Sequence, residues 1–148
     1  MTGSTPEPWS IPFPLEFVVA GTPVALGASA SSKDRWKSQV GAGARLRLRE
    51  LGDWEWLDDR AVAVTIFYFL AAAMEGDIDN IIKPILDAMA GIVYRDDRVV
   101  ERVLAQRFEP GLSWEFNTRS VVLVNALDAT PPVVYIRIQD DLNWRQVS

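Results

Sequence analysis

Residues 61–70 read AVAVTIFYFL, and the polar run DIDNIIK follows at residues 77–83. The first stretch is apolar at nearly every position and rich in β-branched and aromatic residues. A strand that is apolar on both of its alternating faces is typical of a sheet covered on both sides. We therefore predict that residues 61–70 form the central strand and that the fold is built around it.

Downstream of this strand, residues 80–91 have the spacing of a helix. Pro84 is tolerated only in a first helical turn, which places the start of the helix at Asp79 or Asn80. Gly91 is a suitable residue for its end. The predicted apolar stripe consists of Ile82, Ile85, Leu86 and Met89.

Upstream, residues 14–20 (PLEFVVA) predict a short strand closed by a Gly-Thr-Pro turn. A helix is expected to start near Ser32. Its distal part could be helix or strand, because Gly41 and Gly43 weaken a helix and residues 45–49 (RLRLR) alternate with a period of two.

The C-terminal third predicts three further strands, at residues 99–108, 120–126 and 133–138, with a long hairpin loop at 109–119. The resulting order is β-α-β-α-β-β-β. This order favours an α+β domain in which two main helices pack on a small mixed β-sheet.

The length of 148 residues suits one domain, which we place at residues 14–148. Residues 1–13 contain three prolines among polar residues and are expected to form a flexible N-terminal arm. The sequence has neither a membrane-length apolar run nor a signal peptide, so we expect a cytoplasmic protein with no membrane partner. It also has no Cys and no His, which excludes thiolate or imidazole metal sites and the Ser-His-Asp triad. Any metal must therefore be bound by oxygen.

Charge is distributed unevenly along the chain. The formal net charge is −5, yet residues 33–49 contain six basic residues and one acid and so carry +5, which leaves −10 for the remainder. Clustered Lys and Arg predict a local phosphate-binding surface, and a solvated helix face is the alternative. The candidate DNA-binding residues are Lys33, Arg35, Lys37, Arg45 and Arg49.

Asp77 and Asp79 lie two positions apart where the central strand leads into the following helix. On an extended segment, residues i and i+2 point the same way, so both carboxylates could face one point. Lys83 follows Asp79 by one helical turn and could reach the same place. Asp96 or Asp97 would join them if the next strand started beside the end of an antiparallel neighbour.

Three carboxylates and a lysine suit phosphodiester hydrolysis. Crowded carboxylates are costly without a cation between them, and Mg²⁺ prefers oxygen ligands. The metal would activate water while the lysine stabilises developing negative charge. Each residue also has a structural alternative: Asp79 or Asn80 as a helix cap, Lys83 as a solvated lysine, and residues 96–97 as a turn.

The segment DIDNIIKPILDAMAGIVYRDDRVVE at residues 77–101 resembles the signature of RusA-type Holliday-junction resolvases. The family pattern is D-x-D-N-x-x-K, a helix with a D-A-hydrophobic element, and D-D-x-x-V. Weaker similarity extends over most of residues 15–108. The resemblance implies a RusA-like fold and Mg²⁺-dependent cleavage, with Mn²⁺ as an alternative ion. It also implies a homodimer that cuts opposing strands of branched, four-way DNA during recombination and repair, as do family members that prophages often encode.

Carried over by position, the resemblance implies that Asp77, Asp79 and Asp97 bind the metal and that Lys83 assists cleavage. Asn80 and Asp96 would be supporting residues.

Two other functions are compatible with the sequence. The first is a RusA-fold binding or regulatory protein without efficient junction cleavage, which is favoured by the net charge and by the absence of basic residues at 71–76 (AAAMEG). The second is a haloacid-dehalogenase-like phosphatase, suggested by a D-x-D after an apolar strand. It is disfavoured because Asp77 lies mid-chain in only 148 residues.

Overall fold

The apolar run at residues 61–70 forms β2 (Val62–Phe69), an interior strand of a four-stranded sheet. The computed structural model describes residues 10–52, 59–74 and 76–146. The sheet order is β1-β4-β2-β3, with β1 at Leu15–Ala20, β3 at Val100–Phe108 and β4 at Val133–Gln139. β2 pairs antiparallel with β4 and parallel with β3, while β1 pairs antiparallel with β4. The predicted α+β fold with a mixed sheet is confirmed.

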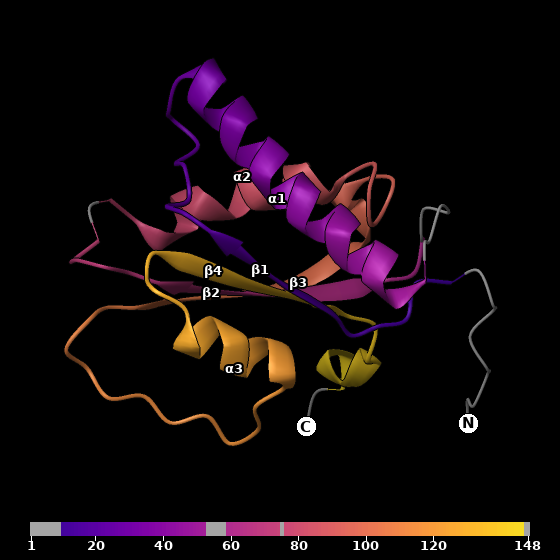
Figure 1. Ribbon diagram of the computed structural model, residues 1–148. Helices are drawn as coiled ribbons and strands as arrows, with labels where there is room; N and C mark the ends of the chain where they lie inside the picture. The colour runs from indigo at the N-terminus through magenta and orange to yellow at the C-terminus, as the bar shows by residue number, and fades with distance from the viewer. Residues whose placement is uncertain (1–9, 53–58, 75, 147–148) are drawn as a thin grey trace.

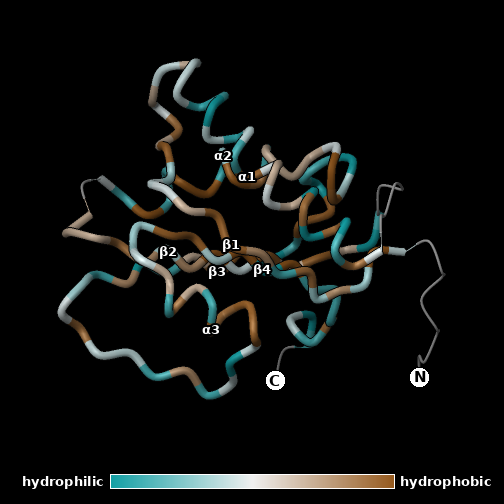
Figure 2. Tube along the Cα trace, in the orientation of Figure 1, coloured by the Kyte–Doolittle hydropathy of each residue, from teal (hydrophilic) through white to brown (hydrophobic). Residues whose placement is uncertain are grey.

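Helices α1 (Ala30–Leu51) and α2 (Ile82–Met89) cover one face of the sheet (Figure 1). The strands are mostly apolar along the trace, whereas the first turns of α1 are hydrophilic (Figure 2). The main core lies between these helices and the sheet. Its largest fully buried side chains include Trp36, Leu15, Ile66, Ile85 and Ile136.

The alternation at residues 45–49 is part of α1, which continues through both glycines. Ser29 caps its N-terminus, because its side-chain oxygen accepts from the Ser32 amide. A Cβ at Gly43 would lie 3.2 Å from Phe17 of β1, and one at Gly41 would lie 3.0 Å from Ile92. The two glycines therefore allow α1 to approach the sheet and the turn after α2, and this close packing offsets their low helix propensity.

The strand predicted at residues 120–126 is wrong, because this segment forms helix α3 (Val121–Asp128). Ser120 caps the helix by accepting from the Leu123 amide at 3.1 Å. Leu123 and Ala126, three positions apart, are buried against the sheet face opposite α1 and α2. Packing thus overrides the β-branched run VVLV. The predicted hairpin at 109–119 is consequently a connection from the edge strand β3 to α3.

The expected N-terminal arm is partly wrong. Residues 1–9 lie outside the described residues, but Ile11 is 1% exposed and belongs to the main core. Its carbonyl accepts a hydrogen bond from the Arg60 guanidinium at 2.5 Å. An isoleucine among prolines can therefore bury its side chain even where the average composition predicts disorder.

No described helix is both long enough and apolar enough to cross a membrane.

Candidate active site

Residues 77–83 form a tight helical turn that leads into α2. Asp77 precedes the 3₁₀ helix η1 (Ile78–Ile81), and its backbone is extended, with φ −102° and ψ 143°. Asp79 and Asn80 lie inside η1, and all three side chains are exposed. The extended segment expected to align Asp77 with Asp79 is therefore wrong.

The cap interpretation of these acids also fails. Asp77 occupies the N-cap position of η1, but its side chain makes no capping hydrogen bond. The N-cap of α2 is Ile81, which has no polar side chain. The carboxylates of Asp77 and Asp79 therefore cap neither helix, and both are exposed to solvent.

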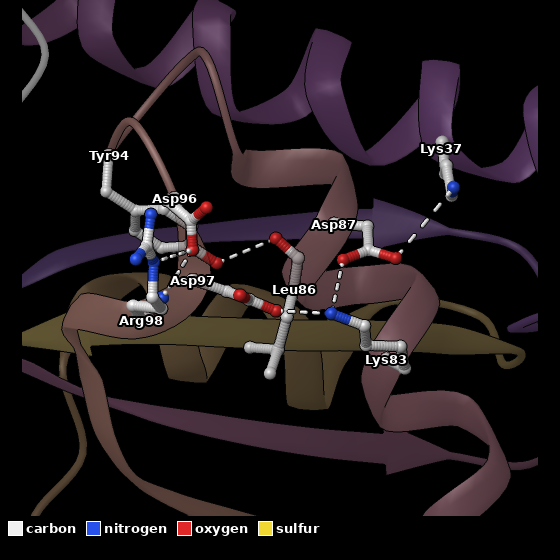
Figure 3. A network of polar contacts seen from close by, with 8 residues as sticks. All are labelled: Lys37, Lys83, Leu86, Asp87, Tyr94, Asp96, Asp97 and Arg98. Carbon is white, nitrogen blue, oxygen red and sulfur yellow. Dashed lines mark hydrogen bonds and ion pairs between the residues drawn. The ribbon is translucent and has the colours of Figure 1, made fainter.

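Lys83 lies between two carboxylates. Its Nζ is 2.5 Å from Asp97 Oδ2 and 2.9 Å from Asp87 Oδ1 (Figure 3). Lys37 of α1 contacts the other carboxylate oxygen of Asp87, with its Nζ 4.0 Å from Asp87 Oδ2. Hydrogen bonds to Asp97 and then to Asp87 raise the pKa of Lys83 above its ordinary value. Lys83 is therefore a fixed positive charge at neutral pH, although half of its side chain is exposed.

Asp97 reaches Lys83 by a different route from the one expected. β2 and β3 are parallel, so β3 starts beside the start of β2, with Val100 opposite Val62. The antiparallel neighbour proposed to deliver Asp97 does not exist. Instead, α2 runs back over the sheet as a crossover, and the chain turns after it to bring Asp97 beside the first turn of α2.

The turn after α2 holds Asp97 in place. Gly91 adopts a positive φ of 83°, and its amide donates to the Tyr94 carbonyl at 2.7 Å. Tyr94 is buried, and its hydroxyl donates to the Leu86 carbonyl of α2 at 2.7 Å. Burial is the main cause that raises the pKa of Tyr94, so the phenol stays protonated as this donor. The turn is therefore anchored to the helix that carries Lys83.

Asp96 has a local structural role. It caps the short helix η2 (Asp97–Val99), because its carboxylate accepts from the Arg98 amide at 2.9 Å. This backbone hydrogen bond is the main cause that lowers the pKa of Asp96. The cap fixes the backbone from which the Asp97 side chain extends toward Lys83.

The three predicted metal ligands do not form a ready cluster. Among the residues described, no group of three or more carboxylates is close enough to hold a metal ion. Asp97 is instead paired with Lys83. The chemistry of the donors fits a hard divalent cation, because Asp77 and Asp79 are exposed carboxylates with neither imidazole nor thiolate nearby.

A pocket of about 400 Å³ opens beside Asp77. Its walls come from the loop after β1 and the loop after β2, and Asn80 also lines it. The Leu26 amide donates to the Asn80 carbonyl at 2.9 Å, and Lys33 donates to the Leu26 carbonyl at 3.1 Å. These two bonds tie the start of α1 to the segment that carries the candidate acids.

The basic residues at positions 33–49 lie on α1, but only some of them lie near the site. Lys33 and Lys37 make the contacts given above, whereas Arg35, Arg45 and Arg49 are exposed on α1. Arg47 pairs with Glu50 on the same helix. A solvated helix face thus remains the alternative for Arg35, Arg45 and Arg49.

Two residues of the site were missed by sequence reasoning. Asp87 follows Lys83 by four positions on α2, the spacing of a helical ion pair, and this signal could have identified it. Tyr94 gives no local signal, because its hydroxyl is used by a carbonyl that only the tertiary fold brings close.

The sequence model of the family described as endodeoxyribonuclease RusA matches residues 28–124. This span contains α1, β2, η1, α2 and β3, and with them every candidate site residue. A search of curated proteins found no match.

Proposed function

The chain belongs to the endodeoxyribonuclease RusA family, and on this premise we propose that it is a Mg²⁺-dependent nuclease that resolves four-way DNA junctions. The observation that carries the proposal is the position of Lys83, held between Asp97 and Asp87 directly after the D-x-D-N turn. A helix cap or a solvated lysine would not need this arrangement.

We assign Asp77, Asp79 and Asp97 as the carboxylates that would bind the ion, with Mn²⁺ as a substitute. When bound, such an ion supplies Lewis-acid polarisation of the phosphate and a more acidic water. Because Asp97 contacts Lys83, it would have to exchange this ion pair for the ion in order to act as a ligand. Asn80, which lines the pocket beside Asp77, would support the neighbouring backbone or phosphate.

Lys83 acts as an electrostatic group and not as a base. Its raised pKa keeps the ammonium protonated at neutral pH. A positive charge held beside the reacting phosphate stabilises the negative charge that develops on its oxygens. Asp87 contacts the Lys83 ammonium directly, and Lys37 contacts Asp87, so both residues help to orient the ammonium.

The DNA would approach along α1 and the pocket beside Asp77. Lys33 and Lys37 stand nearest to the site, and Arg35, Arg45 and Arg49 extend the basic surface along the helix. Because each phosphate contact made by this basic surface releases counterions, binding should weaken as salt rises. Symmetric cuts in two opposing strands require two sites related by a two-fold axis, so we propose a homodimer.

Two observations favour the alternative function, a RusA-fold binding protein without efficient cleavage. The carboxylate of Asp97 is occupied by Lys83, and the lead-in residues Ala71, Ala72 and Ala73 are exposed but uncharged. A chain of this kind would bind a junction or a protein partner and leave the DNA intact.

The test is cleavage of a labelled four-way junction with Mg²⁺. We expect paired, symmetric nicks that Asp79→Asn abolishes while junction binding is retained. Asp128→Asn is the matched control, because it removes the same charge from the exposed C-terminal end of α3 on the other side of the sheet. Cutting that survives Asp79→Asn contradicts the proposal. Tight binding by the wild type without any nicks supports the alternative.

A further inference from the structure

A second pocket, of about 560 Å³, lies on the α3 side of the sheet, away from Lys83. Its floor is a row of aligned residues that crosses all four strands. Glu16 pairs with Arg137, Arg137 with Thr65, and Thr65 with Leu104. The loop at residues 115–120 forms its wall. The row places charged and hydroxyl groups in the middle of a sheet face.

Arg137 in this floor makes no ion pair with a described carboxylate. Its Nε is inaccessible to solvent and has no hydrogen-bond partner, and no described carboxylate lies within 4 Å of its guanidinium. The aligned carboxylate of Glu16 instead accepts hydrogen bonds from the hydroxyls of Ser120 and Tyr135. A half-buried, unpaired charge is costly, and a guanidinium is suited to bind a carboxylate or a phosphate through two parallel hydrogen bonds.

An aromatic surface stands beside this guanidinium. Phe67 stacks on Tyr135, with ring centroids 5.5 Å apart and planes at 28°, and Phe116 lies 5.9 Å from Phe67. All three rings line the pocket. Such rings favour a flat, apolar ligand group next to the bound anion.

The remaining charges restrict the ligand to one with few negative groups. The charged side chains of the lining are two acids and two arginines: Glu16, Glu115, Arg119 and Arg137. A polyanion such as a DNA strand would meet both acids, whereas a ligand with one anionic group could occupy Arg137 alone. The volume is within the range of about 300–1,000 Å³ that is usual for small-molecule sites.

We propose that this pocket binds a small planar organic anion, an aromatic ring system that carries one carboxylate or phosphate group. The anionic group contacts Arg137, and the ring lies against Phe67 and Phe116. The site is independent of the proposed nuclease activity, because it lies on the other face of the sheet and shares no residue with the Lys83 network.

The test is a calorimetric titration of the full chain, without divalent ions, with three probes: adenosine 5′-monophosphate, benzoate and inorganic phosphate. We expect saturable binding of at least one ring-bearing probe, at least tenfold tighter than inorganic phosphate. Comparison of the nucleotide with benzoate shows which anionic group is preferred. Asp79→Asn should bind equally well, which separates this pocket from the candidate active site.

Arg137→Gln should weaken binding about tenfold or more, because two charge-assisted hydrogen bonds are lost. Arg107→Gln is the matched control, since it removes the same charge from β3 on the opposite face of the sheet. If Arg137→Gln fails to fold in a thermal scan, Arg137→Lys keeps the charge but not the paired donors and should weaken binding by a smaller factor. The proposal is overturned if no ring-bearing probe binds up to millimolar concentration, if inorganic phosphate binds as tightly, or if the folded Arg137 variants bind like the wild type.

Discussion

Under α1 and α2 the sheet packs into a continuous apolar core, whereas under α3 it carries charged and hydroxyl groups on its own surface. On the first side, the charged residues stand above the core as the chain Lys37–Asp87–Lys83–Asp97. On the second side, a small cluster around Leu123 and Tyr135 leaves part of the strand surface open. One face therefore provides most of the buried core and carries its charged groups at the rim, whereas the other is packed over a smaller area and leaves a recess.

The largest expected difference between the faces is in stability. Leu15→Ala removes a fully buried side chain from the main core, and Leu123→Ala makes the same change under α3. We expect Leu15→Ala to lower the free energy of unfolding by about 3–5 kcal/mol and Leu123→Ala to lower it by about 2–3 kcal/mol. The second loss is smaller because a site with few buried neighbours can collapse into the cavity. Urea unfolding of both variants measures the difference. Equal losses would mean that the two faces are packed equally well.

The next effect concerns the charged chain on the helix-covered face. If the proposed nuclease activity holds, Lys83→Ala should slow single-turnover junction cleavage by about 100-fold, because a fixed positive charge beside the phosphate is lost. Lys83→Arg should retain part of the rate. The control is again Asp128→Asn under α3, which should cleave at the wild-type rate. A loss of less than about fivefold would reduce Lys83 to a structural ion pair.

A smaller effect is expected at the start of α3. Ser120→Ala removes the N-cap and one donor to Glu16, and it should cost about 1 kcal/mol of unfolding free energy. Ser38→Ala is the matched control, since Ser38 is exposed in the interior of α1 and should change stability by less than about 0.5 kcal/mol. Denaturant unfolding of the two variants shows whether the lost stability comes from the missing cap or from the replacement of any serine.

The smallest effect concerns the contact between the edge strand β3 and the C-terminal segment. Glu101 of β3 binds Arg145 and Trp144 near the C-terminus, and these bonds lower its pKa from 4.5 to about 2. Because the folded pKa is the lower one, the contacts stabilise the fold above about pH 4.5 and are lost as the pH falls toward 2. Glu101→Gln should flatten the stability profile only in that window. A profile that changes near neutral pH instead would point to another group.

Sequence patterns predicted the elements whose local and tertiary preferences agree. The strand predicted at residues 61–70 is present as Val62–Phe69, residues 82–89 form a helix with Pro84 in its first turn, and the strands near residues 15, 100 and 133 are present. The segment 120–126 was predicted wrongly because a run of valines favours a strand, while Ser120 as a cap and burial of Leu123 favour a helix. Two of its signals conflict, and only the packing under α3 decides between them.

The sequence by itself was enough to assign the family and to name the candidate groups: acids without Cys or His, and one lysine at helical spacing from Asp79. Tertiary structure alone decided which of these groups meet. The parallel pairing of β2 and β3 makes α2 a crossover, and that crossover delivers Asp97 to Lys83. The antiparallel pairing of β4 with β1 and with β2 aligns Glu16, Arg137 and Thr65 in one row. Residues far apart in sequence carry no local signal of their contacts, because strand order and register depend on the packing of the whole chain.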